Sequence, residues 1–245
     1  MKNTAIIIPT RLKAKRFPNK PLAKINNIPI IVHVLNRAKE SKVGEVFVAT
    51  SDSEIIEVVK KNGGTIIVTK EDHYSGSDRV HEAYINYLKD STDLIINLQG
   101  DMPNIKPDSI SKLENFMRND NCEIGTLASF IKNKEELSNV NAVKVLTKEE
   151  LKNDNFVDAK DFFRIQSNLN NTNIYHHIGI YAFTNRALTK YVKLSRSRLE
   201  KERSLEQMRA MENNIPIKVA FSDSTPLGVD TENDLSKVAK EMNIV

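Results

Sequence analysis

The first 118 residues alternate between short apolar runs and longer amphipathic stretches. The apolar runs are rich in β-branched residues, and apolar positions recur at helical spacing in the stretches between them. We therefore expect strands at Thr4–Pro9, Glu45–Thr50, Thr65–Thr69 and Asp93–Leu98. Helices are expected over Ile28–Ser41, Ser53–Asn62, Ser77–Leu88 and Lys106–Met117. Such alternation is typical of βαβ units and predicts a doubly wound parallel sheet.

The pattern changes after this half, because extended segments now follow one another with polar turns between them. These segments are Ile124–Ile131, Ala142–Leu146, Phe156–Phe163 and Tyr175–Phe183. Consecutive strands favour an antiparallel arm or an extension of the sheet. One long helix over Ser197–Asn213, a strand at Ile217–Phe221 and a helix at Glu232–Met242 complete the chain. The predicted fold class is α/β, with a doubly wound, mostly parallel sheet and an inserted antiparallel arm. It forms one domain over 1–245, with the insertion at about 124–213.

Composition excludes several classes of protein. The chain has 245 residues, of which 40% are hydrophobic and 28% charged, as in ordinary globular proteins. No apolar run approaches the roughly 18 residues that span a bilayer, and the first apolar run is too short for a secretion signal. We therefore expect a cytoplasmic protein that does not partner with a membrane. The single Cys122 excludes an intramolecular disulfide and a multi-cysteine zinc site.

The charge is modest overall but concentrated in one place. The net charge is +4 and aromatic residues make up 6%, so the sequence favours a local anion site over a nucleic-acid surface. The first predicted strand leads directly into a loop with five cations: Arg11, Lys13, Lys15, Arg16 and Lys20. Open α/β sheets bind ligands at the carboxyl ends of their strands, so a polyphosphate is the expected ligand. The alternative is an ordinary solvated basic turn.

Two aspartates occupy similar places in the pattern. Asp101 follows a buried strand in Gln99-Gly100-Asp101, and Asp230 precedes the last predicted helix in Gly228-Val229-Asp230-Thr231. Mg²⁺ is commonly held by one or two carboxylates together with substrate phosphates. If the aspartates converge beside the basic loop, they predict a metal-nucleotide site. Alternatively, Asp101 is a turn residue, and Asp230 or Thr231 is only the N-cap of the helix.

Two further segments combine polar side chains with a defined position. The run Ser75-Gly76-Ser77-Asp78-Arg79 opens a predicted helix, where backbone donors suit ribose or base contacts, although either serine is also a plain N-cap. His177 and Tyr181 share one face of a predicted strand. A single histidine in a strand is more often a packing residue than a functional one.

Together these segments resemble the 3-deoxy-manno-octulosonate cytidylyltransferase (CMP-Kdo synthetase) family, in the family's order and over almost the whole chain. The similar segments are Pro9-Thr10-Arg11, Arg16-Phe17-Pro18, Lys20-Pro21-Leu22, His73-Tyr74-Ser75-Gly76-Ser77-Asp78-Arg79, Gln99-Gly100-Asp101, Asn141-Ala142-Val143-Lys144, His177-Ile178-Gly179-Ile180-Tyr181, Leu205-Glu206-Gln207-Met208-Arg209 and Gly228-Val229-Asp230-Thr231. The resemblance implies a nucleotide-diphospho-sugar transferase-like fold. It also implies a Mg²⁺-dependent homodimer, with the arm at the subunit contact.

The activity implied by the resemblance is transfer of CMP from CTP to the anomeric hydroxyl of the eight-carbon acid Kdo, with release of pyrophosphate. The product is used in lipopolysaccharide synthesis. The resemblance assigns catalysis to Lys20, Asp101 and Asp230, with the two aspartates as metal ligands. It assigns substrate binding to Thr10, Arg11, Arg16, Ser75, Gly76, Arg79, Gln99, Arg164, His177, Tyr181, Glu206 and Gln207, of which His177, Tyr181, Glu206 and Gln207 would line the sugar side.

The chain also departs from the family pattern. Met102 replaces a glutamate, and Ser77 and Asp78 replace threonine and glutamate, near the expected sugar pocket. Asp161-Phe162-Phe163-Arg164 stands where the family has Tyr-Phe-Ser-Arg, and Ala14 replaces a serine. Since polar partners discriminate between substrates, one alternative is the same reaction on 8-amino-3,8-dideoxy-manno-octulosonate or a sialic-type acid. A second alternative is a nucleotide-binding regulator without activity.

Overall fold

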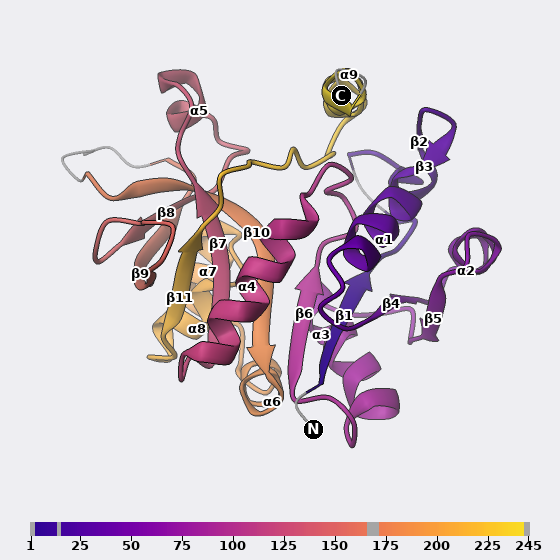
Figure 1. Cartoon of the computed structure of the whole chain (residues 1–245), viewed down its shortest axis with the longest axis horizontal. Coiled ribbons are helices and arrows are strands. Elements are labelled where there is room, and N and C mark those ends of the chain that lie inside the picture. The colour runs from indigo at the N-terminus through magenta and orange to yellow at the C-terminus, as the bar shows by residue number, and fades with distance from the viewer. Residues whose placement is uncertain (1–2, 14–15, 166–171, 243–245) are drawn as a thin grey trace. The chain divides into compact units, whose positions relative to one another are not determined.

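The structure is a computed structural model of the chain, and it describes residues 3–13, 16–165 and 172–242. The chain divides into two compact units (Figure 1). Unit 1 combines 1–111 with 226–245, and unit 2 comprises 112–225. The insertion expected at about 124–213 therefore falls inside unit 2. Ala14, one of the departures from the family pattern, and Lys15 lie outside the described residues.

Four strands of unit 1 are parallel and lie in the order β5-β4-β1-β6. They are β1 (Thr4–Pro9), β4 (Glu45–Thr50), β5 (Thr65–Val68) and β6 (Leu94–Leu98). All residues of β1 and β6 are buried, as the continuous apolar sequence of a parallel sheet predicts. Because the strands are parallel, their carboxyl ends lie at the same edge of the sheet.

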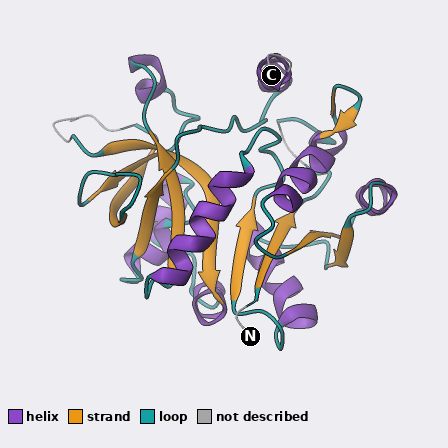
Figure 2. Cartoon of the chain, viewed as in Figure 1, coloured by secondary structure: helices purple, strands orange, loops and turns teal. Residues whose placement is uncertain are grey.

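Helices follow these strands as the periodicity predicts (Figure 2). They are α1 (Ile30–Glu40), α2 (Ser53–Lys61), α3 (Gly76–Ala83) with the π-helical turn η2 (Tyr84–Leu88), and α9 (Glu232–Met242). The 3₁₀ turn η1 (Lys20–Leu22) lies in the basic loop. The helix α4 (Pro107–Asn119) begins in unit 1 and ends in unit 2. α1 begins two residues later than predicted, because β3 (Ile28–Pro29) pairs with β2 (Lys24–Ile25).

Unit 2 contains a mixed sheet. Its strands are β7 (Ile124–Ser129), β8 (Lys144–Thr147), β9 (Phe156–Phe163), β10 (Ile174–Thr184) and β11 (Ile217–Phe221). β7 pairs antiparallel with β10 and parallel with β11, while β9 pairs antiparallel with both β11 and β8. β8 also pairs with β10. The predicted succession of strands is confirmed, and two short helices that the sequence analysis missed are present, α5 (Lys134–Ser138) and α6 (Asn185–Val192).

The long helix predicted over Ser197–Asn213 is wrong. The chain forms α7 (Arg198–Arg203) and α8 (Met208–Glu212), and Ser204 ends α7 in a left-handed conformation with φ 53°. The break has a physical reason in the buried pair of Glu200 and Arg209, whose atoms come within 2.7 Å. In one continuous helix, residues nine apart would lie on opposite sides, about 180° apart.

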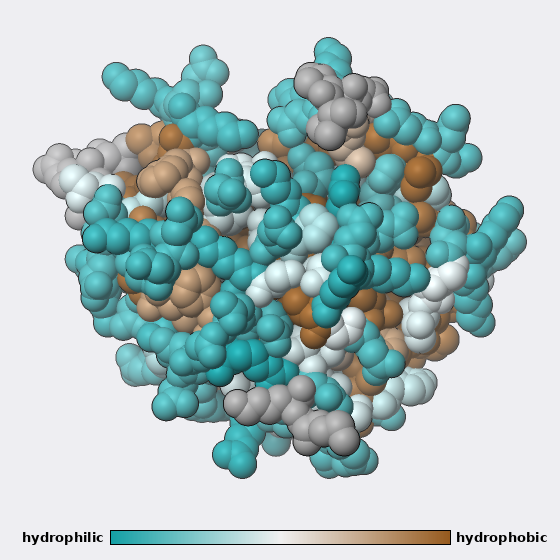
Figure 3. Space-filling view, viewed as in Figure 1, coloured by the Kyte–Doolittle hydropathy of each residue, from teal (hydrophilic) through white to brown (hydrophobic). Residues whose placement is uncertain are grey.

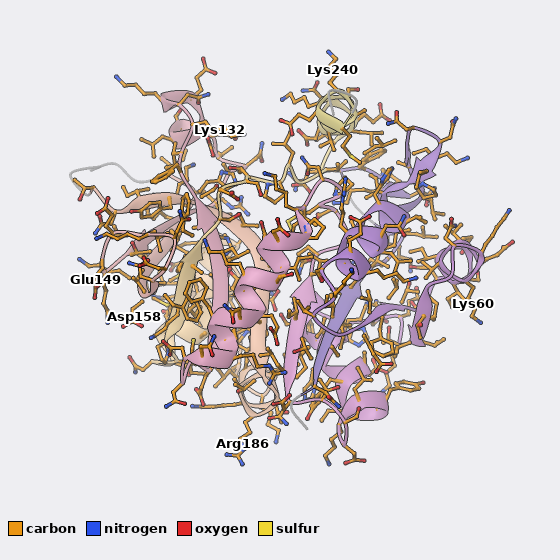
Figure 4. All side chains as sticks on the ribbon, viewed as in Figure 1. Lys60, Lys132, Glu149, Asp158, Arg186 and Lys240 are labelled. Carbon is orange, nitrogen blue, oxygen red and sulfur yellow. The ribbon has the colours of Figure 1, made fainter. Side chains whose placement is uncertain are left out.

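Apolar side chains form the interior of each unit. The face in Figure 3 is largely hydrophilic, with separate apolar patches. Labelled charged side chains such as Lys60 on α2 and Lys240 on α9 extend away from the ribbon (Figure 4). In the part of the chain that the structure describes, no helix has the length and apolar character needed to cross a bilayer.

Candidate nucleotide site

A cavity of about 380 Å³ lies in unit 1 where β1 and β6 end. Thr10 and Arg11 follow β1, Gln99 to Asp101 follow β6, and Ser75 and Gly76 stand at the start of α3. These segments meet because parallel strands deliver their carboxyl ends to one edge. The residues that line the cavity are Pro9, Thr10, Arg11, Lys13, Lys20, Pro21, His73, Ser75, Gly76, Arg79, Gln99, Gly100 and Asp101.

Positive charge dominates this lining. Arg11, Lys13, Lys20 and Arg79 line the cavity, and Asp101 is the one acidic side chain among the lining residues named above. Lys13 also forms an exposed ion pair with Glu71. Guanidinium forks and ammonium groups at a strand edge are suited to bind phosphate oxygens. The cavity therefore has the charge that a polyphosphate needs.

The two aspartates singled out from the sequence converge on one lysine. Lys20 Nζ donates to Asp101 Oδ2 at 2.9 Å and to Asp230 Oδ1 at 3.4 Å. Arg16 forms a second ion pair with Asp230, 2.9 Å from Nη2 to Oδ2. Arg16 and Asp230 are not among the residues lining the cavity, but Asp230 is joined to the lining residue Lys20, and Arg16 is joined to Asp230. The convergence expected from the sequence is present in unit 1.

Backbone contacts explain how Asp230 reaches Asp101. The Val229 N–H donates to the carbonyl oxygen of Asp101 at 2.9 Å. The N-cap role is taken by Thr231, whose hydroxyl oxygen accepts from the N–H of Asp234, while Asp234 Oδ2 accepts from the Thr231 N–H in return. Capping the helix therefore does not occupy the Asp230 carboxylate. That carboxylate faces Lys20 and Arg16 instead.

The charges around Lys20 alter its pKa. Burial acts most strongly and lowers the pKa of the Lys20 ammonium, but the carboxylates of Asp101 and Asp230 together outweigh it, so the pKa is raised. The side chain is 15% exposed. Lys20 is therefore a permanent cation at neutral pH, held between two anions.

Arg79 has a different position from the one expected of a ligand-binding arginine. It lines the cavity, but the residue is only 3% exposed. Its guanidinium donates to Thr69 Oγ1 and to the carbonyl oxygens of Lys70 and Glu71, the latter two at 3.1 and 3.0 Å. Burial lowers the pKa of Arg79. These contacts show that Arg79 supports the wall formed after β5.

The start of α3 uses its polar side chains for capping. Ser75 Oγ accepts from the Asp78 N–H at 3.3 Å and donates to Asp78 Oδ2 at 2.8 Å, so Ser75 is an N-cap that also lines the cavity. Ser77 is buried and accepts from Asn97 Nδ2 at 3.3 Å. Asn97 Oδ1 in turn accepts from Gln99 Nε2 at 3.1 Å, which fixes the orientation of the Gln99 amide beside the cavity.

Residues at the positions that depart from the family pattern have structural roles in unit 1. Met102 is 5% exposed and is not among the lining residues. Asp78 bonds with Ser75, and Ser77 with Asn97. Gly100 packs closely against Pro9, because a Cβ at residue 100 would lie 3.3 Å from the Pro9 carbonyl oxygen. The close approach at this glycine is thus to the protein backbone.

Lys13 and His73 line the cavity although the sequence analysis gave neither an individual role in the site. Lys13 belongs to the basic loop, and its place in that loop was the available signal. His73 lines the cavity, and its Nε2 lies 2.6 Å from Glu82 Oε2, while Nδ1 is buried without a hydrogen-bond partner among the described residues. No short sequence pattern points to His73, because its partner Glu82 comes nine residues later in the chain, near the end of α3.

Unit 2 brings together several residues expected on the sugar side. The rings of His177 and Tyr181 are 5.4 Å apart, on one face of β10 despite an irregularity in its register between them. His177 Nε2 lies 3.0 Å from Thr126 Oγ1, and burial lowers its pKa to about 3, so the ring is neutral. Burial and the nearby charge of Glu206 raise the pKa of Tyr181. The Tyr181 hydroxyl is buried without a hydrogen-bond partner among the described residues.

Glu206 and Gln207 lie in the turn that separates α7 from α8. Tyr191 OH donates to the Glu206 carbonyl oxygen at 2.7 Å, and Gln207 is 8% exposed. Arg209 lies over the Tyr191 ring, 5.0 Å from its centroid. The Tyr191 hydroxyl therefore fixes the backbone of the turn at Glu206.

Arg164 lies at the end of β9 and contacts a neighbouring loop. Its Nη1 donates to the carbonyl oxygens of Val140 and Asn141 at 3.1 and 3.3 Å. Lys144, only 1% exposed, donates to the Arg164 carbonyl oxygen at 2.6 Å. Asp161, another departure from the family pattern, pairs with Arg203 at 2.6 Å.

The chain matches the model of the cytidylyltransferase family over residues 5–218, and it belongs to that family. It is 41% identical to the 3-deoxy-manno-octulosonate cytidylyltransferase of Rhodopseudomonas palustris strain BisB5 over 240 residues, which are 98% of this chain and 97% of that protein. It is 43% identical to the enzyme of the same name from Thermodesulfovibrio yellowstonii, with 98% of each chain covered.

Solved structures agree with this assignment. A CMP:2-keto-3-deoxy-manno-octonic acid synthetase complexed with CTP is 35% identical, with a TM-score of 0.89 and 99% of each chain covered. A 4-diphosphocytidyl-2C-methyl-D-erythritol synthase from Anaerococcus prevotii is 15% identical, with a TM-score of 0.68, and shows likeness of fold alone. The chain is a nucleotidyltransferase with the nucleotide-diphospho-sugar transferase fold, as the sequence analysis predicted.

Proposed function

We propose that this chain transfers CMP from CTP to the anomeric hydroxyl of Kdo and releases pyrophosphate. The relatives named above act on this sugar by their names, and a CTP complex is known for one of them. The observation that supports the proposal in this chain is the position of Lys20. It joins Asp101 and Asp230 at the edge of a cation-lined cavity.

The reaction is an in-line displacement at phosphorus. The anomeric oxygen forms a bond to the α-phosphorus, the bond from that phosphorus to the bridging oxygen breaks, and pyrophosphate leaves with the electron pair. Arg11, Lys13 and Lys20 line the cavity as cations and stabilise the negative charge that accumulates on the leaving group. The sugar hydroxyl loses its proton to solvent or to a phosphate oxygen.

The donor set fits Mg²⁺. Asp101 and Asp230 supply carboxylate oxygens that both reach the Lys20 ammonium, and their side chains are 30% and 41% exposed. Among the described residues, no group of three or more His, Cys, Asp or Glu side chains forms a metal cage. Mg²⁺ commonly uses one or two carboxylates and completes its shell with phosphates and water. Bound by Asp101 and Asp230, the ion would offset the charge of the triphosphate.

The sugar side is assigned to unit 2, with His177, Tyr181, Glu206 and Gln207 as its polar residues and Arg164 as a further substrate contact. The Tyr181 hydroxyl is a buried donor without a hydrogen-bond partner among the described residues, and buried donors favour a polar partner. The lipopolysaccharide role of the product, a cytoplasmic location and a homodimeric state belong to the same proposal. They are supported by the resemblance to CMP-Kdo synthetases, and sedimentation of the purified protein measures the oligomeric state.

A pyrophosphate-release assay tests the proposal. Purified protein is given CTP and Mg²⁺ with Kdo, with 8-amino-3,8-dideoxy-manno-octulosonate, or with N-acetylneuraminate. We expect the highest kcat/KM with Kdo, because Met102, Ser77 and Asp78 make packing and capping contacts. A preference for either other sugar would replace Kdo as the substrate. Background release with all three sugars would favour a nucleotide-binding regulator.

A further inference from the structure

The carboxylate of Asp52 contacts the basic loop. Asp52 Oδ2 accepts a hydrogen bond from the Leu12 N–H at 2.9 Å, across 40 residues of sequence. The Thr50 hydroxyl donates to the same oxygen at 3.5 Å, and the Asp52 N–H donates to Thr50 Oγ1 at 3.1 Å. Asp52 immediately precedes α2, yet its side chain makes no capping hydrogen bond to that helix. Its carboxylate is thus directed to the loop instead of to the helix N-terminus.

Both backbone polar groups of Leu12 are hydrogen-bonded. Its N–H is bound by Asp52, and its carbonyl oxygen accepts from the Asn19 N–H at 3.1 Å. Two residues earlier, the Thr10 N–H donates to the Ala49 carbonyl oxygen at 3.1 Å. The beginning of the loop is therefore fixed to the end of β4 at two points, of which only the one at Leu12 depends on a side chain.

Leu12 stands between two cations of the cavity. Arg11 precedes it and Lys13 follows it, and both line the cavity while Leu12 does not. The position of the Leu12 backbone therefore sets where the side chains of Arg11 and Lys13 leave the main chain. Asp52 also adds negative charge beside these cations, and it opposes the burial that lowers the pKa of Arg79.

We propose that Asp52 is a positioning residue for CTP binding, which acts through the Leu12 amide to hold Arg11 and Lys13 toward the triphosphate. This inference rests on the proposed function, because it takes CTP as the ligand of the cavity. A loop that is already ordered loses less conformational entropy when the phosphates bind. Asp52 is not among the residues that line the cavity, so its role is to position the loop and not to act as a catalytic residue.

The test compares Asp52→Ala with Asp52→Asn. The asparagine variant would keep an oxygen acceptor for the Leu12 amide without the charge, whereas the alanine variant would remove the acceptor. Asp120→Ala is the matched control, because it changes the net charge equally and removes an aspartate that pairs with Lys218 at 2.7 Å in unit 2. Steady-state kinetics with CTP and Kdo, CTP binding by calorimetry, and amide hydrogen exchange at Leu12 are measured for each variant.

We expect Asp52→Ala to raise both KM and Kd for CTP by about tenfold, as loss of a hydrogen bond to a charged group predicts. KM for Kdo and kcat should change less than threefold, and exchange at Leu12 should become faster. Asp52→Asn should restore KM for CTP to within about threefold of the wild type, and Asp120→Ala should match the wild type. A role in folding alone would lower the active fraction, and thus apparent kcat, while KM for CTP stayed the same.

Unchanged CTP affinity in Asp52→Ala, or an Asp52→Asn variant as impaired as Asp52→Ala, would overturn the inference. If Asp52→Ala yields no folded protein, Asp52→Ser removes the long-range acceptor and the same outcomes apply. Should the wild type bind CTP but not transfer CMP to Kdo, the proposed function fails. Calorimetry and amide exchange would still decide the role of Asp52.

Discussion

Lys20 Nζ lies 2.9 Å from Asp101 Oδ2, although 81 residues separate the two in sequence. The contact joins the loop after β1 to the loop after β6, and Asp230 completes it from the last loop of unit 1. One ammonium thus lies between two carboxylates beside a cavity of otherwise positive charge.

Neutralising either aspartate should abolish most activity. We expect Asp101→Asn and Asp230→Asn each to lower kcat by roughly a thousandfold or more, because each would lose a charged ligand for the proposed Mg²⁺. The KM for CTP should change much less, since Arg11 and Lys13 remain. Pyrophosphate release at varied CTP and Mg²⁺ measures both quantities. Turnover within tenfold of wild type for both variants would refute the metal-site assignment, and Asp120→Asn in unit 2 is the control.

Removing the Lys20 ammonium should leave two facing carboxylates without their shared counter-ion. In Lys20→Met we therefore expect kcat to fall by about a hundredfold or more, through lost stabilisation of the leaving pyrophosphate. The melting temperature without Mg²⁺ should fall as well, and added Mg²⁺ should recover part of the loss by occupying the two carboxylates. Differential scanning fluorimetry with Mg²⁺ and with EDTA measures this difference. A Mg²⁺ response equal to that of the wild type would contradict it.

The raised pKa of Lys20 also gives stability a dependence on high pH. In the folded state the ammonium holds its proton more tightly than in the unfolded state, where its pKa is about 10.4. The stabilising contribution of Lys20 to the free energy of unfolding is therefore complete below the unfolded pKa. It is lost as the pH rises through the higher pKa of the folded state. Unfolding in denaturant between pH 9 and pH 11.5 should show a steeper loss of stability in the wild type than in Lys20→Met. If the two proteins lost stability equally over this pH range, the raised pKa of Lys20 would not contribute to folding.

His177 should make stability sensitive to acid. Its folded pKa of about 3 lies below the unfolded value of about 6.5, so between these pH values the unfolded chain binds a proton that the folded chain does not. The contribution of His177 to the free energy of unfolding is complete above pH 6.5. It falls by up to about 1.4 kcal/mol per pH unit as the pH drops below that value. His177→Gln should flatten that acid slope and leave the slope between pH 7 and 8 unchanged. Urea unfolding at a series of pH values provides the measurement.

Two neighbouring glutamates in α7 offer a matched test of burial. Glu200 pairs with Arg209 at side-chain exposures of 4% and 3%, whereas Glu202 pairs with Arg198 at 51% and 75%. Glu200→Gln should cost roughly 3 kcal/mol of unfolding free energy, because it leaves the Arg209 charge buried without its carboxylate. Glu202→Gln should cost less than about 1 kcal/mol. Equal losses in denaturant unfolding would show that burial does not separate the two pairs.

Local patterns predicted the regular elements well. The bounds of β1, β4, β9, β11 and α9 agree with the predicted ones, because apolar periodicity and chain-breaking residues act over a few neighbouring positions. The same reasoning failed between residues 197 and 213. There the helical pattern is interrupted at Ser204, and the stabilising contact, Glu200 with Arg209, needs the chain to fold back.

The sequence alone determined the chemistry that this protein can offer. A buried strand followed by five cations, together with two aspartates after apolar segments, specified charge, donor atoms and the edge of the sheet, since these depend on residue type and on parallel pairing. The tertiary structure alone decided which residues of the chain contact one another. Asp230 meets Lys20 because the Val229 amide binds the Asp101 carbonyl, Arg79 supports a wall, and Asp52 holds the Leu12 amide. Contacts between residues tens of positions apart depend on how the elements pack, and no local pattern records that.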